Sequence, residues 1–208
     1  GTMSKGKGRC LKCGAVIPNE HIRKEIFENE EEMLLAVVLN NKKGKEYDLP
    51  NKDDLEVVER ARDVLEEKWY VLVKEDLVPF EEIPLGDVRS AKYLKNWQDY
   101  LNPRQKLLFV TLITLIRRYI KKLKKQKDEE YAKAVATYLS FVLGKHINYN
   151  CRSTTWHRTF EKISGTTSLR GLSILWDHAE VNAFIKGSGT LIGIEENIKK
   201  SLIVPYDT

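Results

Sequence analysis

One uninterrupted stretch, Asn102 to Gln126, constrains the fold of this chain more than any other segment. Asn102 is a favourable helix cap, Pro103 suits the first turn, and neither glycine nor a second proline follows before Gln126. The pattern predicts a helix about 35 Å long, at about 1.5 Å per residue. Residues 107–116 carry no charge, so we expect other elements to cover this half of the helix on almost every side.

The second half of the same helix is cationic. Its basic residues follow one another with no acid among them: Arg117, Arg118, Lys121, Lys122, Lys124, Lys125 and Lys127. Such a row can neutralise phosphates, and each contact adds affinity that falls with salt. The same row can instead complement the negative end of the helix dipole, with the acids at 128–130 balancing it. Both interpretations remain open at the level of sequence.

Asp128 and the two acids after it indicate the start of a second long helix, to about Ile147. Two long helices joined by a brief polar turn form an antiparallel hairpin. Further along, residues 172–181 and 194–200 are each expected to form a short helix.

Before this hairpin, the apolar run 33–39, a glycine-containing turn and residues 46–50 predict a β-hairpin. A helix capped by Asn51 or Asp53 follows, with an acidic outer face. We therefore predict a fold that is mainly α with a small β part. Its helical domain (89–208) is built on the long antiparallel helix hairpin. Residues 1–76 hold a truncated zinc ribbon, the β-hairpin and the acidic helix, and residues 77–88 form an extended linker.

Charge is distributed unequally along the 208 residues. The first 100 residues hold 17 Lys and Arg against 21 Asp and Glu, a net charge of −4. Residues 101–208 hold 18 against 9, a net charge of +9. A polyanionic partner should therefore meet the second half of the chain. The sequence contains no recognisable signal peptide or membrane span.

Two of the three cysteines, Cys10 and Cys13, have the spacing of a zinc knuckle, and Gly14 allows its tight turn. A structural zinc site needs four ligands, so these two thiols predict a half site. The candidates for further ligands within the chain are His21 and, far away in the sequence, Cys151 or another histidine. Three cysteines form no disulfide framework, which favours a reducing, cytoplasmic setting. The opening Gly-Thr-Met resembles a tag remnant and suggests a fragment of a longer protein.

A second cationic segment lies at 152–158, where arginines, hydroxyls, a tryptophan and a histidine occur together. This mixture can bind phosphates through Arg152 and Arg158 and stack a base on Trp156. The alternative is that Trp156 is structural and anchors the loop.

The remaining candidates for chemistry are weak. Glu81 and Glu82 are adjacent and so point apart, and no nucleophile is linked to the Asp177–His178 pair. The glycine-containing segment 184–190 lacks the preceding buried strand that a methyl-donor loop requires, so we interpret it as a flexible turn. No catalytic residue is predicted.

Four stretches, taken in order, resemble one family. They are Cys10–Gly14; Val78–Pro84; Trp97–Leu108; and the set Tyr138–Leu139, Tyr149–Asn150, Trp156–His157 and Trp176–Asn182. Their order and spacing resemble the middle region of the adenine-specific DNA methylases of archaea and bacteria that contain a zinc ribbon. The resemblance extends from Cys10 to about residue 200, and its motif residues are Trp176, Asp177, Glu180 and Asn182.

The resemblance implies a non-catalytic insertion of an S-adenosylmethionine-dependent enzyme, because the family's glycine loop lies before this region and its Asp-Pro-Pro-Tyr motif after it. The methyl donor and a complete zinc ribbon would then belong to the full-length enzyme. The implied partners are the catalytic halves of the same chain. Two departures from the family are Cys151, where serine is usual, and Ala183, where proline is usual.

From the charge balance we expect the insertion to bind double-stranded DNA. The residues predicted to do so are Arg104, Arg117, Arg118, Lys121, Lys122, Arg152 and Arg158, with Trp156 available to stack. The rival hypothesis is a scaffold or protein-interaction module that makes no contact with DNA.

Overall fold

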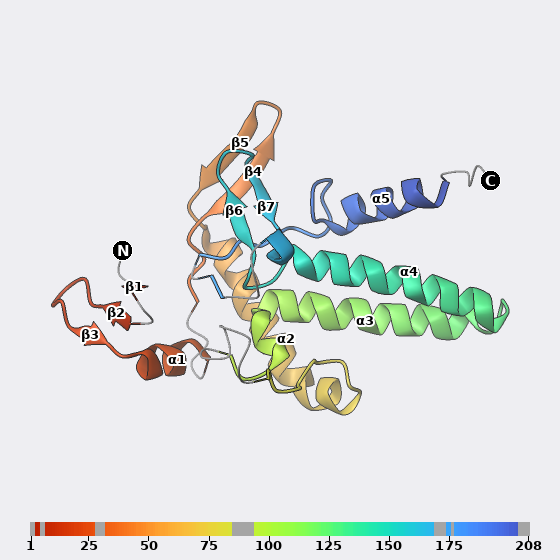
Figure 1. The fold of residues 1–208 in the computed structure, drawn as a ribbon, viewed down its shortest axis with the longest axis horizontal. Coiled ribbons are helices and arrows are strands. Elements are labelled where there is room, and N and C mark those ends of the chain that lie inside the picture. Colours follow the sequence, from red (N-terminus) through yellow and green to blue (C-terminus); the bar gives the residue numbers. More distant parts are fainter. Residues whose placement is uncertain are drawn as a thin grey trace.

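A computed structural model describes residues 3–4, 7–27, 32–84, 94–168, 174–175 and 177–203 of the chain. Within these ranges the fold is mainly α, with five α-helices and small antiparallel sheets (Figure 1). Its longest helices are α2 (Lys52–Lys74), α3 (Pro103–Leu123) and α4 (Glu129–Asn148). In the described ranges no helix combines the length and the apolar character needed to cross a membrane.

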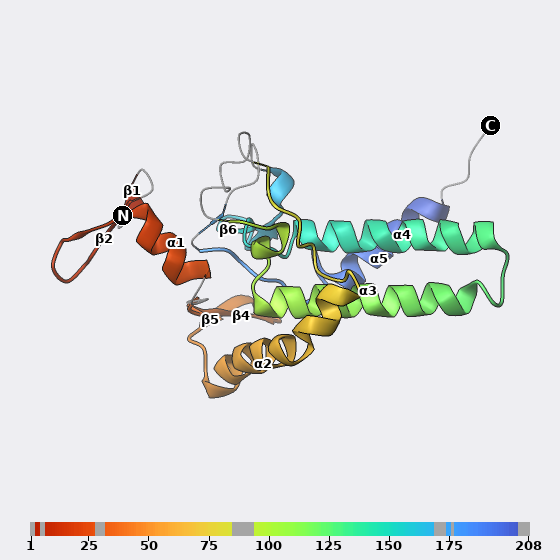
Figure 2. The ribbon, with the colours of Figure 1, turned by 90° about the horizontal axis from the view of Figure 1, so that it is seen from below.

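Helix α3 begins where local chemistry predicts. The Asn102 side chain accepts from the N–H of Gln105, the Gln105 side chain accepts from the N–H of Asn102, and Pro103 occupies the first turn. Asp128 caps α4 in a similar way through the N–H of Tyr131. Helices α3 and α4 run antiparallel and side by side in both views, and residues 124–128 join them (Figures 1 and 2).

Helix α2, capped by Asn51 and Asp54, packs against α3 and builds the main core. The buried residues of this core are Leu65, Leu72, Leu77, Val78 and Val110. The prediction that residues 107–116 are covered on almost every side is wrong. Only Val110 among them is buried, and Leu115 is 50% exposed, because α2 and α4 pack on two sides of α3 and leave its third side open.

Of the predicted extended linker (77–88), residues 77–84 are described; they are extended but packed. Their backbone runs beside residues 95–98: the Ile83 N–H donates to Lys95 O, and the Trp97 N–H donates to Glu81 O. Ile83 forms a second buried cluster with Leu94 and Tyr100. The described residues next to this segment form the 3-10 turn η2 (Trp97–Tyr100). Residues 85–93 lie outside the described residues.

The β structure consists of short antiparallel pairings. Strands β1 (Met3–Ser4), β2 (Lys7–Arg9) and β3 (Val16–Ile17) precede helix α1 (Asn19–Phe27). Strand β4 (Val37–Asn41) pairs with β5 (Gly44–Asp48) in the segment where a β-hairpin is predicted. A further pair, β6 (Thr155–His157) and β7 (Lys162–Ser164), has no counterpart in the sequence predictions. A 3-10 turn, η3 (Thr166–Ser168), follows β7.

The C-terminal segment differs from its prediction in one place. Residues 177–182 are not helical, because their groups bind elsewhere: the Ala179 N–H donates to Thr154 O and the Val181 N–H donates to Asn150 Oδ1. Residues 172, 173 and 176 of the predicted 172–181 helix lie outside the described residues. The last helix, α5 (Leu191–Ile203), includes the predicted 194–200 segment and packs on α4.

Candidate functional site

The turn between α3 and α4 carries a cluster of exposed cations at the far end of the helix hairpin (Figure 1). We call this cluster the cationic tip; it comprises Arg118, Lys121, Lys122, Lys124, Lys125 and Lys127. Lys124 makes one ion pair across the turn, 3.8 Å from Glu129, and Lys127 lies 6.0 Å above the ring of Tyr131. No described acid pairs with the other four cations.

The acids after the turn point mostly along their own helix. Glu130 lies 2.9 Å from Lys133, and Glu129 is 3.8 Å from both Lys133 and Lys124. The cationic tip is therefore only weakly neutralised by the acids that follow it. Two exposed aromatic rings, Tyr119 (51%) and Tyr131 (50%), lie among the cations.

Arg117 is not part of the cationic tip. Its guanidinium donates to two backbone carbonyl groups at the C-terminal end of α2, Glu75 O at 2.7 Å and Asp76 O at 2.9 Å. Asp76 has a φ of 53°, which marks the turn by which the chain leaves α2. Arg117 thus ties α2 to α3, and its predicted contact with phosphate competes with this structural role.

Arg104 also binds within the protein. Its guanidinium makes a two-pronged contact with Glu180, at 3.1 and 2.8 Å, and Asn102 Nδ2 donates to the same carboxylate. His178 Nε2 lies 3.4 Å from Asn102 Nδ2 and 4.0 Å from Glu180. Among the other motif residues, Asp177 is exposed, Asn182 accepts from the Phe184 N–H, and Trp176 lies outside the described residues. Glu180 therefore docks the 177–182 segment onto the start of α3.

Arg152, predicted to bind DNA, is 4% exposed. Its Nε lies 2.6 Å from Glu32, and its Nη1 donates to Asp99 O at 2.8 Å. A buried guanidinium that is already bound to a carboxylate and a carbonyl has no face left for a phosphate. The structure thus separates Arg152 from Arg158, which is exposed in the β6–β7 turn.

Trp156 is half-buried and also has an internal partner. Its indole N–H donates to Tyr47 Oη at 3.2 Å, and the two rings meet edge to face with centroids 6.2 Å apart. Tyr47 belongs to β5, so this contact joins the β4–β5 pair to the β6–β7 pair. The geometry favours the structural interpretation of Trp156 over base stacking.

The glycine-containing segment 187–193 packs closely against its surroundings. Gly189 has a φ of +78°, and a Cβ there would lie 2.5 Å from Tyr149 Cβ. The Gly189 carbonyl accepts from His146 Nδ1 at 3.0 Å, and His146 is 3% exposed. These glycines permit close packing on α4, which differs from the flexible turn that the sequence predicted.

His146 is neutral in this arrangement. Its Nδ1–H donates to Gly189 O, so Nε2 is left to accept from the Asn150 amide at 3.3 Å. Burial lowers the pKa of His146, an effect partly offset by the Gly189 carbonyl. Burial also lowers the pKa of His178, with smaller opposing effects from Glu32 and Glu180.

We expect these two histidines to make stability depend on pH. A pKa below the unfolded value of about 6.5 means that the stabilisation is present above pH 6.5 and is lost as the pH falls below it. Each histidine should then reduce the free energy of unfolding by up to about 1.4 kcal/mol per pH unit below that value. Urea denaturation between pH 7.5 and 5.5 measures the slope. His146→Gln should flatten it; a slope equal to that of the unchanged protein would contradict the assignment.

Cys10 and Cys13 lie on the tight turn predicted for a knuckle. The Gly14 N–H donates to Cys10 O at 2.9 Å, and Gly14 has a φ of 74°. The backbone N–H groups of Cys13 and Lys12 lower the pKa of the Cys10 thiol, as a metal-binding thiolate requires. The two thiols fit half of a tetrahedral zinc site, and within the described ranges no group of three or more potential ligands occurs. Cys151 is buried elsewhere, and burial raises the pKa of its thiol.

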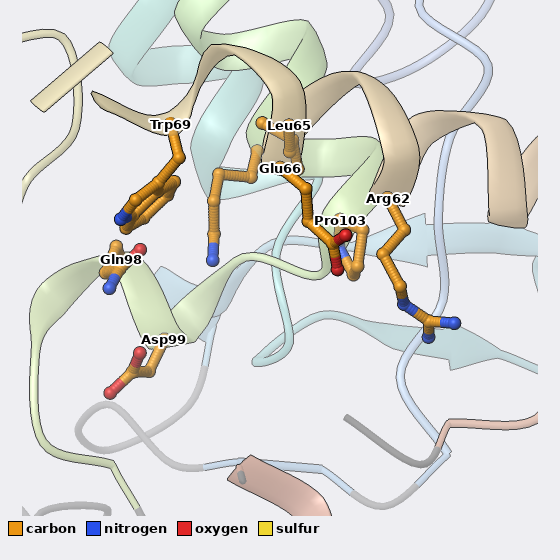
Figure 3. A pocket seen from close by; sticks show the side chains of 8 residues that line it. Arg62, Leu65, Glu66, Trp69, Gln98, Asp99 and Pro103 are labelled. Carbon is orange, nitrogen blue, oxygen red and sulfur yellow. The ribbon is translucent and has the colours of Figure 1, made fainter. Parts of the chain in front are cut away.

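A cavity of about 400 Å³ lies where α2, η2 and the start of α3 meet (Figure 3). Its wall includes two cations, Arg62 and Lys106, and two acids, Glu66 and Asp99. Because these charges balance, the cavity does not extend the cationic surface. Comparison of the chain with protein-family models, curated proteins and solved structures gives no match.

Proposed function

We propose that this chain is a non-catalytic, DNA-binding region of an S-adenosylmethionine-dependent, adenine-specific DNA methyltransferase. The observation that carries the DNA-binding part is the cationic tip. Arg118, Lys121, Lys122 and Lys125 are exposed on a projecting helix hairpin and have no described acid beside them. A duplex carries one negative charge per about 1.7 Å of its axis, so it can occupy several of these cations at once.

The methyltransferase part of the proposal rests on the ordered motifs described above. In the complete enzyme an adenine would leave the duplex and accept a methyl group on its exocyclic amine. No residue of this region is assigned to that step. Its role would be to bind the duplex and to position the target for catalytic groups elsewhere in the longer protein.

Zinc would have a structural role in the same proposal. Cys10 and Cys13 would supply two thiolate ligands, and two further ligands would come from another segment. The metal would stabilise the fold of the N-terminal strands.

The test removes four cations of the tip together: Arg118, Lys121, Lys122 and Lys125, each changed to Ala. Fluorescence anisotropy with a labelled 30-base-pair duplex should show at least a tenfold loss of affinity at about 0.1 M salt. The slope of log affinity against log salt should become shallower by about 3 to 4, because each phosphate contact contributes about 0.9.

A matched control removes four exposed lysines from α2 and α5 instead: Lys52, Lys68, Lys74 and Lys200. The net charge changes equally in the two variants, so only a localised site can distinguish them. Equal affinities and equal slopes in the two variants would disprove a binding site at the tip.

The second candidate function is a scaffold, which is favoured by exposed aromatic residues on α4. Phe141 is 62% exposed and Tyr138 is 42% exposed, and their rings pack edge to face. On this hypothesis α4 packs against other parts of a longer protein. The same anisotropy titration separates the two functions, since a scaffold shows no saturable binding of DNA.

A further inference from the structure

The turn between β6 and β7 presents one large apolar side chain to solvent. Phe160 is 67% exposed, although it lies in a turn of only a few residues. Its ring is nonetheless fixed in place. The ring of His157 packs against it with centroids 4.7 Å apart, and Lys162 Nζ lies 5.3 Å from its centroid. The Phe160 N–H donates to His157 Nδ1 at 3.3 Å.

The β6–β7 turn is bound to the neighbouring strand β5. Glu161 has a φ of 44°, a conformation that is unfavourable for a residue with a side chain. Its carboxylate accepts a hydrogen bond from the Tyr47 hydroxyl at 3.1 Å. The oxygen of the Tyr47 hydroxyl in turn accepts a hydrogen bond from the Trp156 indole. The β4–β5 pair therefore holds the β6–β7 turn in the shape that projects Phe160.

Two cations lie close to this exposed ring in the sequence, and one of them, Lys162, contacts it. Arg158 and Lys162 are exposed on either side of it in the sequence. The β4–β5 turn carries two further exposed lysines, Lys42 and Lys43. The acid of the turn, Glu161, is the group that binds Tyr47. A fixed aromatic ring among cations is suited to a partner that offers both negative charge and flat apolar faces.

Nucleic acid has both properties. Proteins that bend or open a duplex insert apolar side chains between base pairs, and single-stranded bases stack on aromatic rings. The alternative of a membrane surface fits less well, because a single ring and a few cations supply little apolar area for insertion.

We propose that Phe160 is a base-contacting wedge that stacks on an unpaired or unstacked base, while Arg158 and Lys162 bind the adjacent phosphates. This inference rests on the proposed DNA-binding function and adds a second contact to it. The phosphates bound at the cationic tip and the base bound at the β6–β7 turn would belong to different parts of one DNA molecule.

The experiment compares two labelled duplexes of equal length, one fully paired and one with a single bulged 2-aminopurine. The unchanged protein should bind the bulged duplex more tightly. Phe160→Ala should lose about 5- to 150-fold in affinity for it, the range that corresponds to about 1–3 kcal/mol for stacking one base. Its affinity for the paired duplex should change much less. Phe160→Tyr should retain the preference.

Phe184→Ala is the matched control, because Phe184 is 69% exposed in a different loop. Thermal melting of each variant verifies folding. If Phe160→Ala and Phe184→Ala bind the bulged duplex equally, the wedge is refuted while binding at the tip stands. If the unchanged protein binds neither duplex, both proposals fail. A loss in Phe160→Ala of binding to anionic vesicles, with DNA binding unchanged, would also refute the wedge and indicate a membrane contact.

Discussion

Arg152→Ala should lower the free energy of unfolding by about 3 kcal/mol, because it removes a buried guanidinium that binds both a partly exposed carboxylate and a backbone carbonyl. Arg152 is 4% exposed and bridges Glu32 to the carbonyl of Asp99, so its loss leaves both groups without that donor. Urea denaturation followed by circular dichroism measures the change. Arg152→Lys should lose part of this stability, since an ammonium group cannot reproduce the fork of a guanidinium.

The neighbouring Arg158 provides the contrast. It is exposed, so Arg158→Ala should alter stability by no more than about 0.5 kcal/mol. For DNA binding we expect the larger effect from Arg158. Arg158→Ala should flatten the slope of log affinity against log salt, and folded Arg152→Ala should not. Equal stability of the two variants would show that the Arg152 contacts contribute little to the fold.

Gly193→Ala is the second substitution with a large expected effect. A Cβ at this position would lie under 3.0 Å from the Gly187 carbonyl oxygen, which is backbone and cannot rotate away. The segment before α5 would have to shift, and we expect a loss of about 2–3 kcal/mol in the free energy of unfolding. Thermal and urea denaturation both report this loss.

Gly144→Ala is a matched control within the same pair of packed helices. Gly144 lies in α4 with nothing within 4 Å of an added Cβ. Because glycine is unfavourable inside a helix, this substitution should stabilise the protein by about 0.5–1 kcal/mol. A neutral Gly193→Ala, measured beside a stabilising Gly144→Ala, would show that the 187–193 segment is loosely packed.

The helices could be predicted because their signals are local. Asn102 with Pro103, Asp128, and Asn51 each satisfy N–H groups of the first turn that follows, and the structure begins α3, α4 and α2 at these residues. Such caps need no knowledge of the rest of the chain. The mainly α fold with a small β part is confirmed for the same reason.

Contacts between distant segments could not be predicted. Arg152 and Glu32 are 120 residues apart, and an arginine beside hydroxyls in a loop is typical of an exposed site. The indole of Trp156 likewise donates to Tyr47, which lies on another hairpin, 109 residues away in the sequence. The sequence does not single out Phe160, because the three-residue strands on either side of it are too short to show alternation.

The segment 177–182 illustrates a different reason. Its polar residues at helical spacing predicted an amphipathic helix. Instead, Glu180 binds Arg104 and Asn102 at the first turn of α3, and backbone groups of the segment bind Thr154 and Asn150. Tertiary hydrogen bonds thus replaced the helical ones, an outcome that a local pattern does not reveal.

The contact of Glu180 with Arg104 lies at the start of α3, and the cationic tip lies at the other end of the same helix. A tilt of about 10° at that contact would swing the far end of a helix about 30 Å long by about 5 Å. That displacement exceeds the rise of one base pair. On the proposed DNA-binding function, a small change at this contact would alter which phosphates the lysines of the cationic tip reach, so a substitution there would shift the position of the protein on DNA without contacting the DNA.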